Sequence, residues 1–373
     1  MKKIIIAPDS FKGCMTSETV TDIIADAVLA KTDYEPVRLP IADGGEGSTR
    51  CIIKALGGTL KTLKVHSAEN KLIDAVYGIT AHDTAVLEIA ETSGITKQTS
   101  YNALAATTVG YGELIKAALD EGCRRFLLCL GGSATTDCGA GMAHALGVKF
   151  IAAKGNDFVP VGGTLSKVAK IDLSGLDERI KESRFLIMSD VDNPLYGPNG
   201  AAYVYGPQKG ASEEDIVVLD NGLSHIASLM KKAGLIDCDE VVGAGAAGGL
   251  GYACTAYFNG VIQSGINAIL NICNFDEMVK DAAMVVSGEG KLDSQSLMGK
   301  VVGGISKRCG DRPLIVFCGR CDLDGYLLMD TGIRPVEIGR GKTLEDSIQN
   351  GAVYLKEKAE EFFAEYTENE GEV

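Results

Sequence analysis

Short apolar runs that stop at glycines and lead into helical patterns recur along this chain. The clearest example lies in residues 125–147, where the apolar run 126–130 stops at Gly131 and Gly132 before a helical stretch begins. A run this short, with no alternating polar residues, is typical of a strand buried on both faces of a parallel sheet. A glycine-rich turn at a helix start also points unpaired N–H groups at one place, which favours an anion such as phosphate. A tight strand-to-helix connection that binds nothing is the other interpretation of these glycines.

The same order of strand, corner and helix is predicted for most of the chain. Apolar positions in residues 16–31 recur at the 3.6-residue spacing of an amphipathic helix, and Ser212 with Asp215 forms a capping box that opens another helix. Alternating strands and helices are typical of an α/β fold built on parallel sheets. The predicted strands are residues 3–7, 35–42, 84–90, 126–130, 185–189, 283–287, 314–318 and 333–338.

The composition is that of a globular protein with an excess of acidic residues. Hydrophobic residues make up 46% of the 373 residues and charged residues 23%, and the length favours two domains over one core. The net charge of −14 argues against sequence-independent binding to nucleic acid or to anionic membranes, since both require an exposed basic face. Small anions need only a few local cations, and four lysines stand beside glycines or hydroxyl residues: Lys12, Lys209, Lys291 and Lys300.

The N-terminal sequence and the cysteines together favour a cytoplasmic location. The apolar run after Lys2 and Lys3 is too short for a secretory signal, and no segment approaches the roughly 20 apolar residues of a membrane span. Eleven cysteines in such a chain suggest reduced thiols. Cys318 and Cys321 have the spacing of half a zinc site or a redox pair. Because no second pair or nearby His completes a tetrahedral site, we favour two small core residues.

Five corners at the ends of predicted strands carry acids, hydroxyls or amines, and all of them except residues 190–195 contain glycine. Ligands of parallel sheets bind at this carboxyl edge, so the corners are expected to supply one site. Their residue types suit an anionic, phosphorylated ligand together with a metal ion. Phosphoryl transfer fits this set because it depends on positioning and charge neutralisation more than on a special nucleophile. The corners are residues 9–13, 43–48, 131–137, 190–195 and 288–300.

A glycine pattern near residue 245 supports a competing hypothesis. Gly243, Gly245 and Gly248 form a G-x-G-x-x-G sequence, as in NAD-dependent oxidoreductases. The predicted strand before it is only two residues long, and no acid follows at the spacing that a ribose requires. A non-catalytic protein that binds small anions between two α/β lobes is a further alternative, since it would use the same corners.

At these corners the chain resembles the bacterial glycerate kinase family, the type I glycerate kinases. The matching stretches are APDSFKG, PIADGGEGS, GGSATTDCGAGM, SDVDNPL, YGPQKGAS, GAGAAGGLG and SGEGKLDSQSLMGK, in this order from Ala7 to Lys300. The resemblance implies a kinase that uses ATP and magnesium to phosphorylate D-glycerate. The 2-hydroxyl is the favoured acceptor, which would give 2-phosphoglycerate, and formation of 3-phosphoglycerate is the alternative. The segment after Phe317 matches the family poorly.

The resemblance also implies two α/β domains, one of them inserted into the other. The chain order agrees, because the strand–helix units before about residue 65 and after about residue 280 can form one parallel sheet. We therefore expect a Rossmann-like α/β domain of residues 1–65 and 280–373. Residues 66–279 would form the inserted α/β domain, and the active-site cleft is expected between the two. D-glycerate is the expected partner, with no nucleic acid and no membrane, and the chain is expected to be a monomer or a homodimer.

From the family pattern and the corner chemistry together we predict the roles of individual residues. Backbone amides in two corners would hold the nucleotide phosphates: Gly131, Gly132 and Ser133, and Gly288, Glu289 and Gly290. Lys12 or Lys300 would neutralise the transferred group. Asp190 and Asp293 would coordinate magnesium or accept the hydroxyl proton. Contacts to the glycerate hydroxyls or the metal would come from Asp9, Ser10, Asp43 and Glu46.

Overall fold

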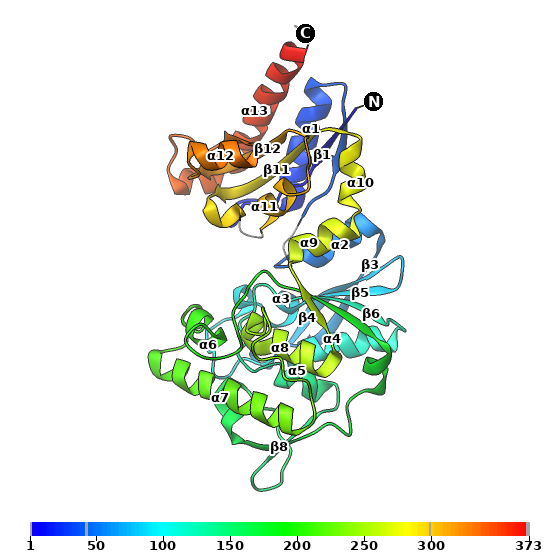
Figure 1. Cartoon of the computed structure of the whole chain (residues 1–373), viewed down its shortest axis with the longest axis vertical. Helices are drawn as coiled ribbons and strands as arrows, with labels where there is room; N and C mark the ends of the chain where they lie inside the picture. The colour runs from blue at the N-terminus through cyan, green and yellow to red at the C-terminus, as the bar shows by residue number, and fades with distance from the viewer. Residues whose placement is uncertain (1, 42–43, 298–299, 371–373) are drawn as a thin grey trace. The chain divides into compact units, whose positions relative to one another are not determined.

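The computed structural model describes residues 2–41, 44–297 and 300–370, and the chain forms two compact units (Figure 1). The first unit combines Met1–Asp43 with Ile266–Val373, and the second is Gly44–Gly265. The second unit therefore interrupts the first along the chain. Both units consist of strands that alternate with helices, which is the α/β class expected from the sequence.

The two units divide at residues other than the expected 65 and 280. Helix α2 (Ser48–Leu56) belongs to the second unit, where the carboxylate of Glu88 accepts a hydrogen bond of 2.9 Å from the N–H of Gly47 at the start of this helix. At the other boundary, Gly304 packs so closely against Ile266 that a Cβ added to the glycine would lie 2.5 Å from the Ile266 side chain. These contacts assign α2 to the second unit and Ile266 to the first.

Five parallel strands form the sheet of the first unit, in the order β13-β12-β11-β1-β2. The strand order reverses between β1 and β11, because β2 lies to one side of β1 and the later strands are added on the other. In doubly wound sheets, ligands bind outside the carboxyl ends of the strands at this point. The strands are β1 (Lys3–Ile6), β2 (Glu35–Arg38), β11 (Ala282–Leu292), β12 (Leu314–Cys321) and β13 (Ile333–Glu337).

Helices α1 (Ser17–Lys31) and α13 (Leu344–Glu370) lie side by side in the first unit (Figure 1). Both begin with a threonine cap: the hydroxyl of Thr16 accepts from the N–H of Thr19, and that of Thr343 accepts from the N–H of Asp346, each at 3.2 Å. The two helices share one core with the sheet, which includes Ile4, Ile6, Val20, Ile24, Met284, Val286, Phe317, Leu355 and Phe363. The other helices of this unit are α9 (Gly265–Ile272), α10 (Phe275–Lys280), α11 (Val301–Ser306) and α12 (Gly325–Thr331), with the 3₁₀ turn η5 (Ser294–Leu297).

The sheet of the second unit has six strands in the order β10-β9-β6-β5-β4-β3. The first four are parallel, whereas β4 and β3 join as an antiparallel hairpin at one edge. The strands are β3 (Gly58–His66), β4 (Leu72–Thr80), β5 (Thr84–Glu88), β6 (Arg125–Cys129), β9 (Arg184–Met188) and β10 (Val261–Gln263), and a separate pair is formed by β7 (Lys149–Ala152) and β8 (Val168–Asp172). The helices are α2, α3 (Ile89–Ser93), α4 (Val109–Asp120), α5 (Ala140–Ala145), α6 (Ala201–Tyr205), α7 (Glu213–Lys232) and α8 (Ala246–Phe258). Ser212 and Asp215 form the predicted capping box at the start of α7.

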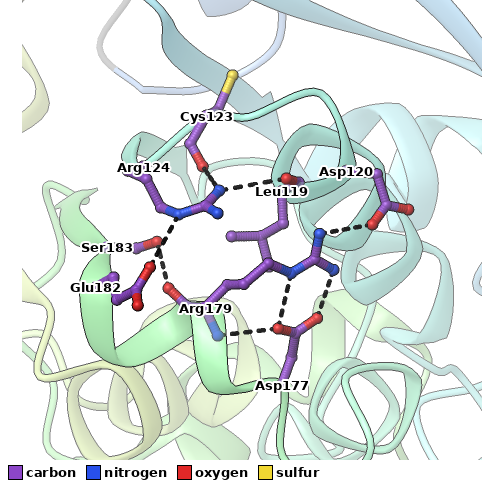
Figure 2. Close-up of polar contacts among 8 residues, drawn as sticks. All are labelled: Leu119, Asp120, Cys123, Arg124, Asp177, Arg179, Glu182 and Ser183. Atoms are coloured by element: carbon purple, nitrogen blue, oxygen red, sulfur yellow. Dashed lines mark hydrogen bonds and ion pairs between the residues drawn. The ribbon is translucent and has the colours of Figure 1, made fainter.

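An arginine fixes the segment that leads into β9 (Figure 2). The guanidinium of Arg179 forms two bonds to the carboxylate of Asp177, at 2.9 and 2.7 Å, and an ion pair of 2.8 Å to Asp120 at the end of α4. Arg124, just before β6, donates to the carbonyl oxygens of Leu119 and Cys123 at 3.3 and 2.9 Å. The end of α4 is thereby attached to the segments that lead into β6 and β9.

Candidate functional site

A cavity of about 810 Å³ lies at the carboxyl edge of the sheet of the first unit. The segments after β1, β12 and β13 line it, together with the end of β11, so the cavity occupies the position where doubly wound sheets bind their ligands. Its basic side chains are Lys12, Lys291, Lys300, Arg320, Arg340 and Lys342, and its acidic ones are Asp9, Glu289, Asp293, Asp322 and Glu337.

The segment after β1 brings Asp9, Ser10 and Lys12 to this cavity. The N–H of Asp9 donates to the carbonyl oxygen of Gly288 at 2.8 Å, which extends the pairing of β1 with β11. The N–H of Ser10 donates to the carboxylate of Asp9 at 2.6 Å. Phe11 is buried in the core below, so the polar residues on either side of it line the cavity.

Strand β11 continues farther than expected, to Leu292, so Gly288, Glu289 and Gly290 are strand residues rather than a turn. Gly288 and Glu289 pair with Phe317 and Cys318 of β12. A Cβ added to Gly288 would lie 3.1 Å from the carbonyl oxygen of Phe317, so the glycine permits close strand contact there. The predicted phosphate cradle at these three residues is therefore part of the sheet, with Glu289 and Gly290 lining the cavity.

Glu289 is buried, with 9% of its surface exposed. Its Oε1 atom has no hydrogen-bond partner among the residues that the structure describes. Burial raises the pKa of Glu289 to about 7, and the negative charges of Asp9 and Asp293 act in the same direction. A hydrogen bond with the Ser296 side chain and the positive charge of Lys300 oppose this rise in pKa. Glu289 is therefore a carboxyl group that exchanges a proton near neutral pH.

Asp293 has a different environment from Glu289. Its Oδ1 atom accepts from the N–H groups of Gln295 and Ser296 at 3.0 and 3.3 Å, and its Oδ2 atom lies 3.2 Å from Nζ of Lys291. The hydrogen bond from Lys291 is the main reason that the pKa of Asp293 lies below its usual value. Asp293 is thus ionised and orders the turn η5.

The cations of the cavity fall into two groups. Lys291 lies 3.1 Å from a carboxylate oxygen of Asp322, which also pairs with Arg320 at 2.6 Å. Within residues 2–41, 44–297 and 300–370, by contrast, four of these cations have no ion-pair partner: Lys12, Lys300, Arg340 and Lys342. Of these four, Lys12 and Lys300 belong to the predicted corners, and their amines are available to neutralise an anionic ligand.

Sequence reasoning did not select the other basic residues of this cavity. Arg320 follows the buried part of β12, and Arg340 and Lys342 stand in the segment between β13 and α13. The signal was present, since Gly339-Arg340-Gly341-Lys342 is a glycine-rich corner at the end of a predicted strand. This corner carries no acid or hydroxyl and is therefore not one of the five predicted corners.

In the second unit, Gly131 and Gly132 are placed by contacts with the segment before α2. The N–H of Gly131 donates to the carbonyl oxygen of Gly44 at 3.0 Å, and a Cβ added to Gly131 would lie 2.6 Å from Cα of Gly45. The carbonyl oxygen of Gly132 accepts from the N–H of Ile95 at 2.8 Å. Of the predicted substrate residues nearby, Glu46 is exposed, and Asp43 lies outside the described residues.

The amides at the start of α5 already bind an anion, the carboxylate of Asp137. Its Oδ2 atom accepts from the N–H and the hydroxyl of Thr108, both at 2.8 Å, and from the N–H of Gly141 at 3.3 Å. Its Oδ1 atom accepts from the N–H of Gly139 at 3.1 Å. Burial raises the pKa of Asp137, against the lowering effect of these donors. The N–H groups of Gly139 and Gly141 at the start of α5 thus have an acceptor within the chain, the carboxylate of Asp137. The predicted phosphate contacts at this corner concern other residues, Gly131–Ser133.

Asp190 follows β9 in the second unit, as predicted. Its Oδ1 atom accepts from the hydroxyl of Ser264 and from the N–H of Gly265, both at 2.9 Å. The carboxylate thus caps the start of α9. Asp190 and Asp293 belong to different units, and each is held by contacts of its own.

The glycines of the G-x-G-x-x-G sequence serve close packing. Residues 241–245 form turns, so the strand that a dinucleotide-binding motif requires is absent from this described segment. A Cβ added to Gly248 would lie 2.0 Å from the carbonyl oxygen of Thr135, and the N–H of Cys138 donates to the carbonyl oxygen of Gly248 at 3.1 Å. These contacts explain the glycine without a dinucleotide.

All eleven cysteines are free thiols, and Cys318 is buried within β12. Among the described residues, no three His, Cys, Asp or Glu side chains cluster as a metal site. A helix with the length and apolar character needed to cross a bilayer is likewise not found in the described part of the chain.

Comparison with known proteins decides the family. A model of the glycerate kinase family matches residues 4–367. The chain belongs to the glycerate kinase family. It is 39% identical to the glycerate kinase of Bacillus subtilis (strain 168) over 97% of both chains. It is also 40% identical to the glycerate 2-kinase of Escherichia coli (strain K12), over 90% of this chain and 89% of that one.

The fold of this glycerate kinase family member agrees with a solved structure. The crystal structure of a Salmonella typhimurium LT2 protein assigned as glycerate kinase 2 superposes with a TM-score of 0.85 and 34% sequence identity, covering 99% of both chains. The family and the α/β fold expected from the sequence are therefore confirmed.

Proposed function

We propose that this family member transfers the γ-phosphoryl group of ATP to the 2-hydroxyl of D-glycerate. The observation that carries the proposal is the cavity of the first unit, where Lys12 and Lys300 stand without ion-pair partners among the described residues. Two free cations at the carboxyl edge of a doubly wound sheet suit a phosphorylated ligand. The choice of the 2-hydroxyl follows the name of the Escherichia coli relative.

Each predicted residue has a proposed part in this reaction. Lys12 and Lys300 neutralise charge on the transferred phosphoryl group, which lowers the barrier without a covalent intermediate. Asp9 and Ser10 bind the hydroxyls of glycerate, as do Asp43 and Glu46 in our prediction. The nucleotide phosphates are assigned to the backbone of Gly131–Ser133 and to the segment Gly288–Gly290.

Magnesium is the proposed metal, with Asp190 and Asp293 as its proposed ligands. Proteins usually hold Mg²⁺ through one or two carboxylates while water and substrate phosphates complete its coordination, so a cluster of three acidic side chains is not required. Asp293 fits this donor set because it lines the cavity and its pKa is lowered by Lys291. When bound, the ion would neutralise phosphate oxygens.

The proposed location is the cytoplasm, in keeping with eleven free thiols. A monomer or a homodimer is proposed, with D-glycerate as the partner and neither nucleic acid nor membrane. Light scattering after size-exclusion chromatography would distinguish the two assembly states.

The direct test is phosphorylation of D-glycerate by the full chain with ATP and Mg²⁺, followed by ³¹P NMR. We expect a single new resonance of 2-phosphoglycerate, and a chelator should abolish it reversibly. Lys12→Met and Lys300→Met should each lower kcat/KM by about 10²-fold or more, because each removes a charge that faces the transferred group. Lys280→Met is the matched control, since this exposed lysine pairs only with Glu277 at 2.6 Å among the contacts described.

The outcomes separate the alternatives. A resonance of 3-phosphoglycerate alone would reject the 2-hydroxyl as acceptor while keeping the kinase. Binding of glycerate by folded protein without ATP turnover would support a non-catalytic anion-binding protein. Wild-type rates in both lysine variants would reject the assignment of transfer to this cavity.

A further inference from the structure

The carboxylate of Glu289 differs from the other carboxylates of the cavity in its hydrogen bonding. In the described part of the chain, Glu289 is the single Asp or Glu with a buried oxygen that lacks a hydrogen-bond partner. An unpaired buried acceptor costs free energy, so such atoms in native structures call for an explanation in function. Here the oxygen belongs to a cavity-lining residue at the point where the strand order reverses, between the ends of β1 and β11.

The other carboxylates of the cavity are already engaged. Asp293 accepts two backbone hydrogen bonds and pairs with Lys291. The carboxylate of Glu337 accepts from the N–H of Cys321 at 2.8 Å, and that of Asp322 pairs with two cations. Asp9 accepts from the N–H of Ser10. Glu289 differs from them because its partnerless oxygen, Oε1, is enclosed, so a hydroxyl bound beside it would supply the missing hydrogen bond.

We propose that Glu289 is the catalytic base of this enzyme and takes the proton of the glycerate hydroxyl through Oε1. The inference rests on the proposed function. As the hydroxyl oxygen forms its bond to the γ-phosphorus of ATP, the bond from that phosphorus to the bridging oxygen of ADP breaks, and the electron pair of that bond leaves with ADP. The hydroxyl proton passes to Glu289 and then to water. The products are phosphoglycerate, ADP and one proton.

The groups that face Glu289 suit a base that works near neutral pH. Asp9 after β1 and Asp293 in η5 are negative, and Lys300 before α11 is positive, while Ser296 donates a hydrogen bond. With burial, their balance sets the pKa of this carboxyl at about 7. General bases are most effective when their pKa lies close to the working pH. Asp293, whose pKa is lowered, is a weaker base and is better suited to a cation.

The test compares Glu289→Gln with the wild-type chain in the phosphorylation assay. Glutamine keeps the shape but cannot take the proton, so kcat should fall by about 10² to 10⁴-fold while KM for ATP changes little. In the wild type, kcat/KM for D-glycerate should rise with pH through about 7, and this rise should be absent from the residual activity of Glu289→Gln. Glu289→Asp, which retains a carboxylate, should recover part of the rate. Glu277→Gln, an exposed glutamate of the same unit, is the matched control.

The measurements separate this inference from the proposed function. If the wild-type chain makes no phosphoglycerate, the proposed function fails first. If the wild type is active and Glu289→Gln keeps at least a tenth of its kcat with the same pH profile, Glu289 is not the base. Circular dichroism and a thermal melt show whether the variant is folded. If it is not, the pH profile of Glu289→Asp decides: an unshifted profile would overturn the inference, and a shifted one would support it.

Discussion

The buried carboxylate of Asp137 gives the sharpest test of the structural reasoning. It accepts four hydrogen bonds, from Thr108 twice, Gly139 and Gly141, and is completely enclosed by the second unit. In Asp137→Asn, the amide oxygen can replace Oδ2 and keep three of these bonds. The amide NH₂ group then faces the N–H of Gly139, so a donor meets a donor.

The expected loss of stability in Asp137→Asn follows from these hydrogen bonds. A buried donor left without a partner costs about 1–3 kcal/mol, and each remaining bond loses the extra strength that a charged acceptor gives it. Burial raises the pKa of Asp137, which means that part of the cost is recovered when the charge is removed. We expect a net loss of about 2–4 kcal/mol in the stability of this region.

Hydrogen exchange measured by mass spectrometry reads this loss locally. In the wild type, peptides that contain Thr108 or Gly139 should be protected, and Asp137→Asn should raise their exchange rates by roughly 10²-fold, the equivalent of about 3 kcal/mol. Asp74→Asn is the control, because the side chain of this exposed aspartate has, among the described residues, only an ion pair of 3.8 Å with Lys64. Unchanged exchange at both peptides in a folded Asp137→Asn chain would refute the account of this corner.

Two further predictions concern stability. Gly248→Ala should destabilise the second unit by at least about 2 kcal/mol, because its Cβ would meet the carbonyl oxygen of Thr135 at 2.0 Å with φ at +67°. Gly155→Ala is the control in denaturant unfolding, because a Cβ added to Gly155 would have no neighbouring atom within 4 Å. Equal losses of stability in the two variants would contradict the steric argument. Glu289 has a pKa raised from 4.5 to about 7, so its favourable contribution to stability is complete below pH 4.5 and is lost as the pH rises through 7. The free energy of unfolding of Glu289→Gln relative to wild type should therefore rise from pH 5 to pH 8, by at most about 3 kcal/mol, and denaturant unfolding at each pH measures it. A difference independent of pH would contradict the burial of this charge.

The sequence predicted the central strands because their apolar runs are continuous. Residues 126–130 and 185–189 were expected as strands, and β6 and β9 coincide with them to within one residue at each end. The hairpin of β3 and β4 was not predicted. Most of β3 is exposed and carries Lys61 and Lys64, so it lacks the hydrophobic signal of a central strand.

Prediction of the site from the sequence has a similar limit, because residue types do not show which contacts each side chain forms. The residue types of the corner 288–300 indicated phosphate chemistry, but they did not indicate which acid was free. Whether Glu289 or Asp293 keeps an unused oxygen depends on the turn η5 and on Lys291, Ser296 and the neighbouring strands. Likewise, the glycine-rich turn that begins at Gly131 and Gly132 indicated an anion site, and only the fold shows that the carboxylate of Asp137 occupies the amides at the start of α5.

The two ends of the second unit are anchored at one short segment. Gly44, where the unit begins, packs against the carbonyl oxygen of Met188, and Gly265, where it ends, donates to the carboxylate of Asp190. Domain insertions are tolerated where the ends of the inserted domain lie close together. Two ends held at residues 188–190 thus let the second unit interrupt the first as a complete folded body.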